Sequence, residues 1–220
     1  MTPVVVTLVL TAALLHATWN AILRSGSDRL WSITVMGAVA VLMALPVAIF
    51  VPHPALASWS YITLSAVLQT GYSLFLVRAY RDGHLTHVYP IARGTAPLLV
   101  TLGAAVFAGE QPAQIGLLGI MLVSGGIVTL AMGQPRPDAK STAAALATGA
   151  FIASYMVTDG VGVRLSGQAI GYAAWQAIAQ GGAMFLTYIA IRRRVPAMPR
   201  GRPGGDVLIA SVLGLVGTAW

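Results

Sequence analysis

The residues of this chain that could do chemistry are polar side chains inside long apolar stretches, where each costs free energy in lipid and normally faces a cavity or a bundle interior. In the first stretch His16, Trp19 and Asn20 fall at i, i+3 and i+4, so they share one helix face. Hydrogen-bonded helix contacts beside an interfacial tryptophan are the alternative, and for Trp19 the two interpretations stay open. For His16 and Asn20 together we favour a site that binds a small solute.

A lone arginine lies inside the fourth stretch. Arg93 is about six residues, or roughly 9 Å, from the edge of that stretch, and a charge at the centre of a spanning helix costs on the order of 2.5–3.5 kcal/mol. Tyr89, Arg93 and Pro97 share a face at i, i+4 and i+8, and Pro97 frees a backbone carbonyl there. Arg93 either extends its side chain to the headgroups or lines a cavity; we favour the cavity, with Arg93 as the anchor for a carboxylate or another anion.

Asp159 is the acid that could lie within an apolar stretch, the sixth, and Tyr155 precedes it by one helical turn. A carboxylate at that position suggests a proton-coupling group, or a charge that senses the ammonium of a substrate. The alternative is a residue at the end of a helix, before Gly160 in a turn. Both interpretations remain open from the sequence.

Two further polar stripes occur at helical spacing. One contains Gln69, Tyr72 and Ser73 in the third stretch, and the other contains Gln176 and Gln180 in the seventh. Interhelical hydrogen bonds explain such stripes as readily as contacts to a ligand do. Gln69, Tyr72 and Tyr155 are included with the candidate solute-binding residues.

The elements that must position these residues are membrane-spanning helices. Hydrophobic residues make up 57% of the 220 residues and charged residues 9%, whereas a soluble domain carries about 25% charged residues. Each apolar stretch is continuous and long enough to cross ~30 Å of hydrocarbon as a helix, which argues against the alternating strands of a barrel. We predict an all-α membrane protein with seven full spans and a partial eighth from Asp206. The full spans are expected at about 3–23, 31–51, 58–80, 87–108, 113–132, 141–164 and 169–191.

Basic residues predict the orientation in the membrane. Of thirteen Lys and Arg residues, eleven lie in or beside the loops that follow odd-numbered stretches, which places these loops in the cytoplasm and the N-terminus outside. The net charge of +7 therefore reflects orientation, and we expect no nucleic-acid partner. The eleven are Arg24, Arg29, Arg78, Arg81, Arg136, Lys140, Arg192, Arg193, Arg194, Arg200 and Arg202.

A weak internal repeat divides the chain. Residues 15–20 resemble residues 154–159, and residues 64–68 resemble residues 209–213. We predict a first repeat of five spans at 1–132, a linker at 133–140 and an incomplete second repeat at 141–220. Five crossings restart the second copy from the opposite side, so the repeat must be inverted. The basic loops change places accordingly: the second loop has no Lys or Arg, and its counterpart after the seventh stretch has five.

Residues 79–97 carry a family resemblance. This segment, AYRDGHLTHVYPIARGTAP, together with Gly109-Glu110 and the glycines at 116 and 119, resembles the third-to-fifth-span signature of EamA-type transporters in the drug/metabolite transporter superfamily. Residues 16–20 and 155–160 are similar to the matching parts of that family's two halves. The resemblance implies a ten-span carrier of two inverted five-helix repeats. Relative to that pattern, the rest of span eight and spans nine and ten are missing, so we expect a C-terminally truncated sequence.

The resemblance also implies a function: movement of amino acids or related metabolites across the bacterial inner membrane, commonly as an exporter. The expected partners are a small solute and the lipid bilayer, and oligomeric state stays undetermined. Alternatives are a non-transporting membrane subunit and an intramembrane enzyme; without cysteine and with one plausible buried acid, we do not expect an enzyme. We expect no cofactor, because no phosphate-binding loop is present, and no metal, because His84, His87 and Asp82 bracket a tight turn.

Overall fold

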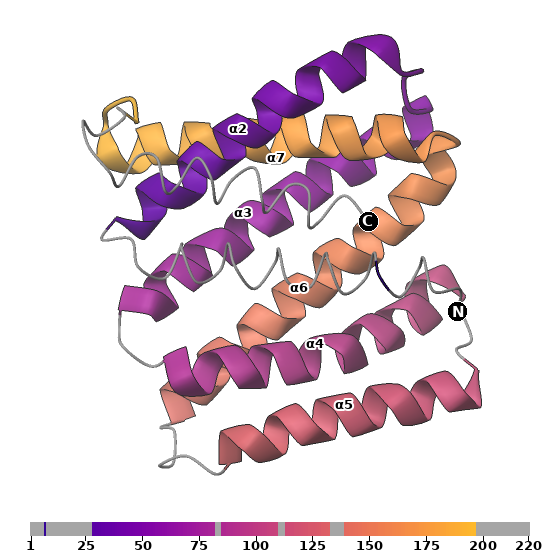
Figure 1. The fold of residues 1–220 in the computed structure, drawn as a ribbon, viewed down its shortest axis with the longest axis vertical. Helices are drawn as coiled ribbons and strands as arrows, with labels where there is room; N and C mark the ends of the chain where they lie inside the picture. Colours follow the sequence, from indigo (N-terminus) through magenta and orange to yellow (C-terminus); the bar gives the residue numbers. More distant parts are fainter. Residues whose placement is uncertain (1–6, 8–27, 82–84, 110–112, 133–138, 197–220) are drawn as a thin grey trace. The chain divides into compact units, whose positions relative to one another are not determined.

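The computed structural model describes residue 7 and residues 28–81, 85–109, 113–132 and 139–196. Over these ranges the regular structure is all helical, which confirms the all-α part of the predicted fold class (Figure 1). The helices match six of the predicted stretches within two residues at each end; the first stretch and the partial eighth lie outside the described residues. The elements are α2 (Arg29–Phe50), the 3-10 turn η1 (Leu56–Ser58), α3 (Trp59–Arg81), α4 (Leu85–Ala108), α5 (Gln114–Met132), α6 (Ala139–Ser166) and α7 (Ala169–Arg192).

Within the described ranges, three helical segments are long and apolar enough to cross a membrane: Arg29–Phe50, Leu56–Arg78 and Thr142–Ser166. Large apolar side chains also point outward, with Phe50 86% and Phe107 79% exposed. Exposing such surface to water costs about 25 cal/mol per Å², a penalty that lipid removes. These described segments are consistent with a membrane protein, and the count of seven or more spans stays a prediction.

The described helices form two packing units. One contains α2 and the part of α7 from Ala173 onward, and the other contains η1, α3, α4, α5, α6 and the first turn of α7 through Tyr172. These units describe packing and leave the predicted inverted repeat untested. Most of its predicted linker, residues 133–138, lies outside the described residues.

In the second unit, α6 lies between α3 and α4, and α5 packs on α4 (Figure 1). Small residues allow the close approach: a Cβ on Gly149 would lie 2.6 Å from Thr95 Oγ1, and one on Gly103 would lie 2.9 Å from Val157 Cγ2. Several buried hydroxyls donate to a carbonyl of their own helix, as when Thr70 donates to the Ala66 carbonyl at 2.7 Å. Glycine contacts of this kind are characteristic of helices that associate in lipid, where apolar area alone gives little driving force.

In the first unit, α2 and α7 cross at a pair of glycines. A Cβ on Gly181 would lie 2.5 Å from the carbonyl oxygen of Gly37, so the two backbones are in direct contact. One end of the contact is filled by Ala44, Ala48 and Ala174, a cluster with no polar atoms in its side chains. The absence of Cβ atoms at the crossing is thus what sets the separation of these two helices.

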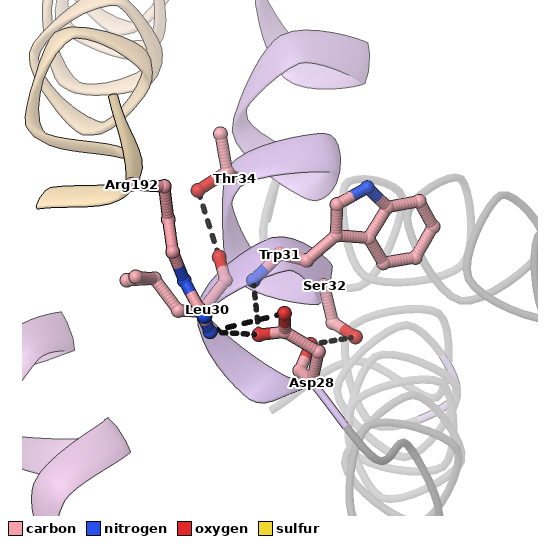
Figure 2. Close-up of polar contacts among 6 residues, drawn as sticks. All are labelled: Asp28, Leu30, Trp31, Ser32, Thr34 and Arg192. Carbon is pink, nitrogen blue, oxygen red and sulfur yellow. Dashed lines mark hydrogen bonds and ion pairs between the residues drawn. The ribbon is translucent and has the colours of Figure 1, made fainter. Parts of the chain in front are cut away.

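The two helices are also joined at their ends (Figure 2). Asp28 caps α2 by accepting a hydrogen bond from the Trp31 amide at 3.1 Å, and its carboxylate pairs with Arg192 at the end of α7, also at 3.1 Å. The pair is exposed to solvent, so its contribution is only about 0.2–1 kcal/mol. Since the first turn of α2 meets the last turn of α7, these helices run antiparallel.

Candidate functional site

The structure brings together four of the predicted site residues. Gln69 and Tyr72 on α3 face Tyr155 and Asp159 on α6. The two stripes were predicted separately, and the packing of α3 on α6 joins them into one cluster. Of the other candidates, His16, Trp19 and Asn20 lie outside the described residues. Tyr89 and Arg93 belong to α4, of which the structure describes the backbone and not these two side chains, so all five roles stay predictions.

Asp159 is the centre of the cluster. It lies inside the apolar segment Thr142–Ser166, and α6 continues past it to Ser166, so Asp159 is not the helix-end residue of the alternative interpretation. Gln69 Nε2 donates a hydrogen bond to its Oδ2 at 3.2 Å, and the Tyr172 hydroxyl donates to its Oδ1 at 2.9 Å. Charge-assisted bonds of this kind are stronger than those between neutral groups.

Ser65 completes the carboxylate's surroundings. It lies one turn before Gln69 on α3 and is fully buried. Its hydroxyl oxygen accepts a second bond from Gln69 Nε2 at 3.1 Å, and the hydroxyl hydrogen-bonds to Asp159. Among the residues that the structure describes, the groups that bond Asp159 are Gln69, Tyr172 and Ser65, and all three are neutral donors.

Tyr172 reaches Asp159 because of two glycines. Gly167, with φ of +64°, ends α6 in the left-handed conformation, and the chain then turns into α7. The Tyr172 ring crosses α6 at Gly162, where an added Cβ would lie 2.7 Å from Cε2 and 2.8 Å from Cζ. Gly162 follows Asp159 at i+3, so the missing side chain opens the path to the carboxylate.

Aromatic rings extend the cluster along the same two helices. The rings of Tyr72 and Tyr155 are 6.0 Å apart and tilted by 54°, and those of Phe75 and Phe151 are 5.2 Å apart and tilted by 36°. These separations are typical of favourable aromatic pairs. Since Tyr155 precedes Asp159 by one turn, a row of rings begins beside the carboxylate.

Sequence reasoning missed Ser65 and Tyr172. A serine in an apolar helix is usually satisfied by its own backbone, so residue type alone does not distinguish Ser65. Tyr172 starts the seventh stretch, where an interfacial tyrosine is expected, and helical spacing does not connect it with Asp159. The sequence offered one signal for this contact: Gly162 lies one helical turn after Asp159 and leaves the face of the helix beside the carboxylate open. The glutamine stripe predicted on α7 makes no comparable contact through Gln176. Its Nε2 is buried and has no hydrogen-bond partner among the described residues, whereas Gln69 Nε2 bonds to Asp159.

Comparisons of the chain with models of protein families, with curated proteins and with solved structures found no match. The cluster around Asp159 must therefore be interpreted from its own chemistry.

Replacing Gly162 with alanine is expected to displace Tyr172 and weaken its bond to Asp159. The new methyl group would overlap the ring, and overpacking of this kind costs about 1–3 kcal/mol. Gly160→Ala is the matched control, because a Cβ there would meet no atom within 4 Å. Thermal unfolding in detergent should give a lower midpoint for Gly162→Ala only. Equal midpoints for the two variants would contradict the described path of Tyr172.

Proposed function

We propose that the chain is an integral membrane secondary transporter, a permease or exporter that moves amino acids or other small metabolites by alternating access. The observation that carries this proposal is the position of Asp159, an acid inside an apolar segment that is held by hydrogen bonds from side chains of α3 and α7. An ionisable group inside an apolar span costs free energy, so its presence there indicates a functional site. Proton relays and substrate counter-charges in transporters use carboxylates in this way.

The family resemblance of residues 79–97 supports the same function and supplies the finer architecture. We propose two inverted five-helix repeats in the bacterial inner membrane, with the N-terminus outside and the solute near the midplane between the halves. In the proposed architecture α2 and α7 are the second and seventh spans, and an even and an odd span cross the membrane in opposite directions. The antiparallel course of these two helices agrees with that arrangement. In the proposed site Asp159 is the proton relay, Gln69 orients it, and Arg93 anchors an anion. His16 and Asn20 form hydrogen bonds to the solute. The aromatic wall of the site consists of Trp19, Tyr72, Tyr89 and Tyr155.

Flux measurements on the full-length protein test this function. Solute profiling of cells that express the protein would identify the transported compound, and reconstitution into liposomes would measure its uptake against protein-free vesicles. Absence of flux for every solute that the profiling identifies would favour the non-transporting subunit.

Within that assay, Arg93→Gln is expected to abolish uptake, because the neutral side chain no longer anchors an anionic group, while the amount of protein in the membrane stays normal. Arg194→Gln, an exposed position beyond the end of α7, is the control and should transport normally. Unchanged flux in Arg93→Gln would end the assignment of Arg93 as an anchor.

A further inference from the structure

The apolar part of α2 places the membrane surface at one end of the first packing unit. The segment Arg29–Phe50 is long and apolar enough to cross a membrane, and Asp28 comes directly before it. Residues that flank the apolar stretch of a spanning helix lie among the lipid headgroups. Asp28 therefore lies at headgroup depth when α2 crosses a membrane.

The end of α7 is held at the same depth. Arg192 Nη2 donates to both carboxylate oxygens of Asp28, at 3.2 Å to Oδ1 and 3.1 Å to Oδ2 (Figure 2). Arg193 is the next residue, so its side chain also starts from the headgroup level. Exposed apolar residues flank the arginines, with Ile191 54% and Val195 65% exposed. Positive charge with apolar side chains beside it matches the amphipathic form of a phospholipid.

Arg193 adopts a backbone conformation that favours glycine. Its φ is +51°, and its N–H donates to the Ile189 carbonyl at 2.7 Å, as a left-handed residue at the end of a helix usually does. A residue with a Cβ is strained in this conformation, and glycine is not. Among the described residues other than glycine, Arg193 alone has a positive φ. A strained residue of this kind indicates that its side chain has a function.

The Arg193 side chain is available to an anion. It is exposed and has no hydrogen-bond or ion-pair partner among the described residues, whereas Arg192 is committed to Asp28. A guanidinium presents its N–H donors in a planar fork that matches two oxygens of a phosphate. Arg194 is also exposed, but its φ is not positive and it lies beyond the residue that ends the helix. Arg193 is therefore the arginine that the structure singles out.

We propose that Arg193, positioned by the Asp28–Arg192 pair, binds the phosphate of an anionic phospholipid at the membrane surface where α2 begins and α7 ends. The phosphate oxygens accept hydrogen bonds from the Arg193 guanidinium, and an acyl chain lies against the exposed side chain of Ile191. A zwitterionic lipid binds less well, because its own cation competes with the arginine for the phosphate. This inference goes beyond the proposed function: it rests on the membrane placement of α2 and not on transport, so either can fail without the other.

Lipid binding to the full-length protein, delipidated in a neutral detergent, tests the inference by native mass spectrometry. The probes are phosphatidylglycerol and phosphatidylcholine with the same acyl chains, and glycerol 3-phosphate as a soluble phosphate. We expect phosphatidylglycerol to bind at least about tenfold more tightly than either of the others, a difference of about 1.4 kcal/mol. Equal binding of the two lipids would overturn the inference, and so would equally tight binding of glycerol 3-phosphate, which would assign Arg193 to a soluble phosphate.

Two variants separate a site from a general attraction between charges. Arg193→Gln should weaken binding of phosphatidylglycerol about fivefold, as expected for one arginine near an anionic surface, and leave binding of phosphatidylcholine unchanged. Arg194→Gln removes an equal charge one residue later, and as the matched control it should bind within about twofold of the wild type. Equal weakening in both variants would overturn the inference.

Glycine substitutions separate the backbone from the side chain. Arg193→Gly relieves the left-handed strain and removes the guanidinium, so the unfolding midpoint in lipid-free detergent should rise while binding of phosphatidylglycerol falls. Arg194→Gly, at a residue whose φ is not positive, should lower the midpoint slightly. Binding of phosphatidylglycerol that is unchanged in Arg193→Gly would overturn the inference.

Discussion

Replacing Asp159 with asparagine is expected to remove concentrative transport from the full-length protein while the helices remain folded. Asparagine has nearly the same shape, but it cannot bind and release a proton or carry a charge. Its amide nitrogen is a donor where Asp159 now accepts from Gln69 and Tyr172. One bond can be recovered by rotating the Gln69 amide, so the structural cost stays at about 1–3 kcal/mol.

Uptake driven by a pH gradient in proteoliposomes is the measurement that checks this expectation. In Asp159→Asn it should fall at least about tenfold, because the asparagine cannot couple uptake to the movement of a proton. Tyr172→Phe removes one hydrogen bond and keeps the carboxylate, so it should reduce uptake by a smaller factor than Asp159→Asn does. An Asp159→Asn protein that concentrates solute as the wild type does would assign Asp159 a structural role only.

Introducing a leucine at Gly181 is expected to push α2 and α7 apart. Even a Cβ at this position would lie 2.5 Å from Gly37 O and 2.6 Å from Val41 Cγ2, and a backbone oxygen cannot move aside as a flexible side chain can. Overpacking by an alanine costs about 1–3 kcal/mol, and leucine should cost more. Gly182→Leu is the matched control on the same helix, because a Cβ at Gly182 would meet no atom within 4 Å.

Thiol cross-linking measures the separation of these helices without background, because the chain contains no cysteine. Ala44 and Ala174 belong to one buried cluster, so cysteines at both positions should be joined by a short thiol cross-linker. We expect a high yield in this double-cysteine protein and in its Gly182→Leu derivative, and a severalfold lower yield with Gly181→Leu. Equal yields in all three would contradict the close glycine crossing.

The helix boundaries were predictable because they follow from a local quantity. A segment that crosses lipid must satisfy every backbone hydrogen bond within itself over about 20 residues, so an apolar stretch of that length specifies both the type and the extent of the element. Residues 31–51 and 169–191 were expected to be helical, and α2 and α7 cover these ranges within two residues. No knowledge of neighbouring helices is needed for this step.

The candidate site was predictable only in part. Asp159 and Gln69 stand out as polar residues in apolar helices, and each can be placed on a helix face by spacing alone. That the two faces meet was not predictable, because the interhelical contact depends on how α3 and α6 pack. Tyr172 was missed for a related reason, since its approach to Asp159 depends on the turn at Gly167 and on the space over Gly162.

By itself, the amino-acid sequence determined that the described part of the chain is helical, that it includes segments apolar enough to cross a membrane, and that Asp159 is an acid in one of them. These properties depend on the apolar composition of each stretch and on the helical spacing of its residues, both of which can be read within about 20 residues. Only the tertiary structure decided that Ser65, Gln69 and Tyr172 hold that acid and that Tyr155 and Tyr72 lie beside each other. Such contacts join residues distant along the chain, and they form where glycines allow helices and rings to approach closely.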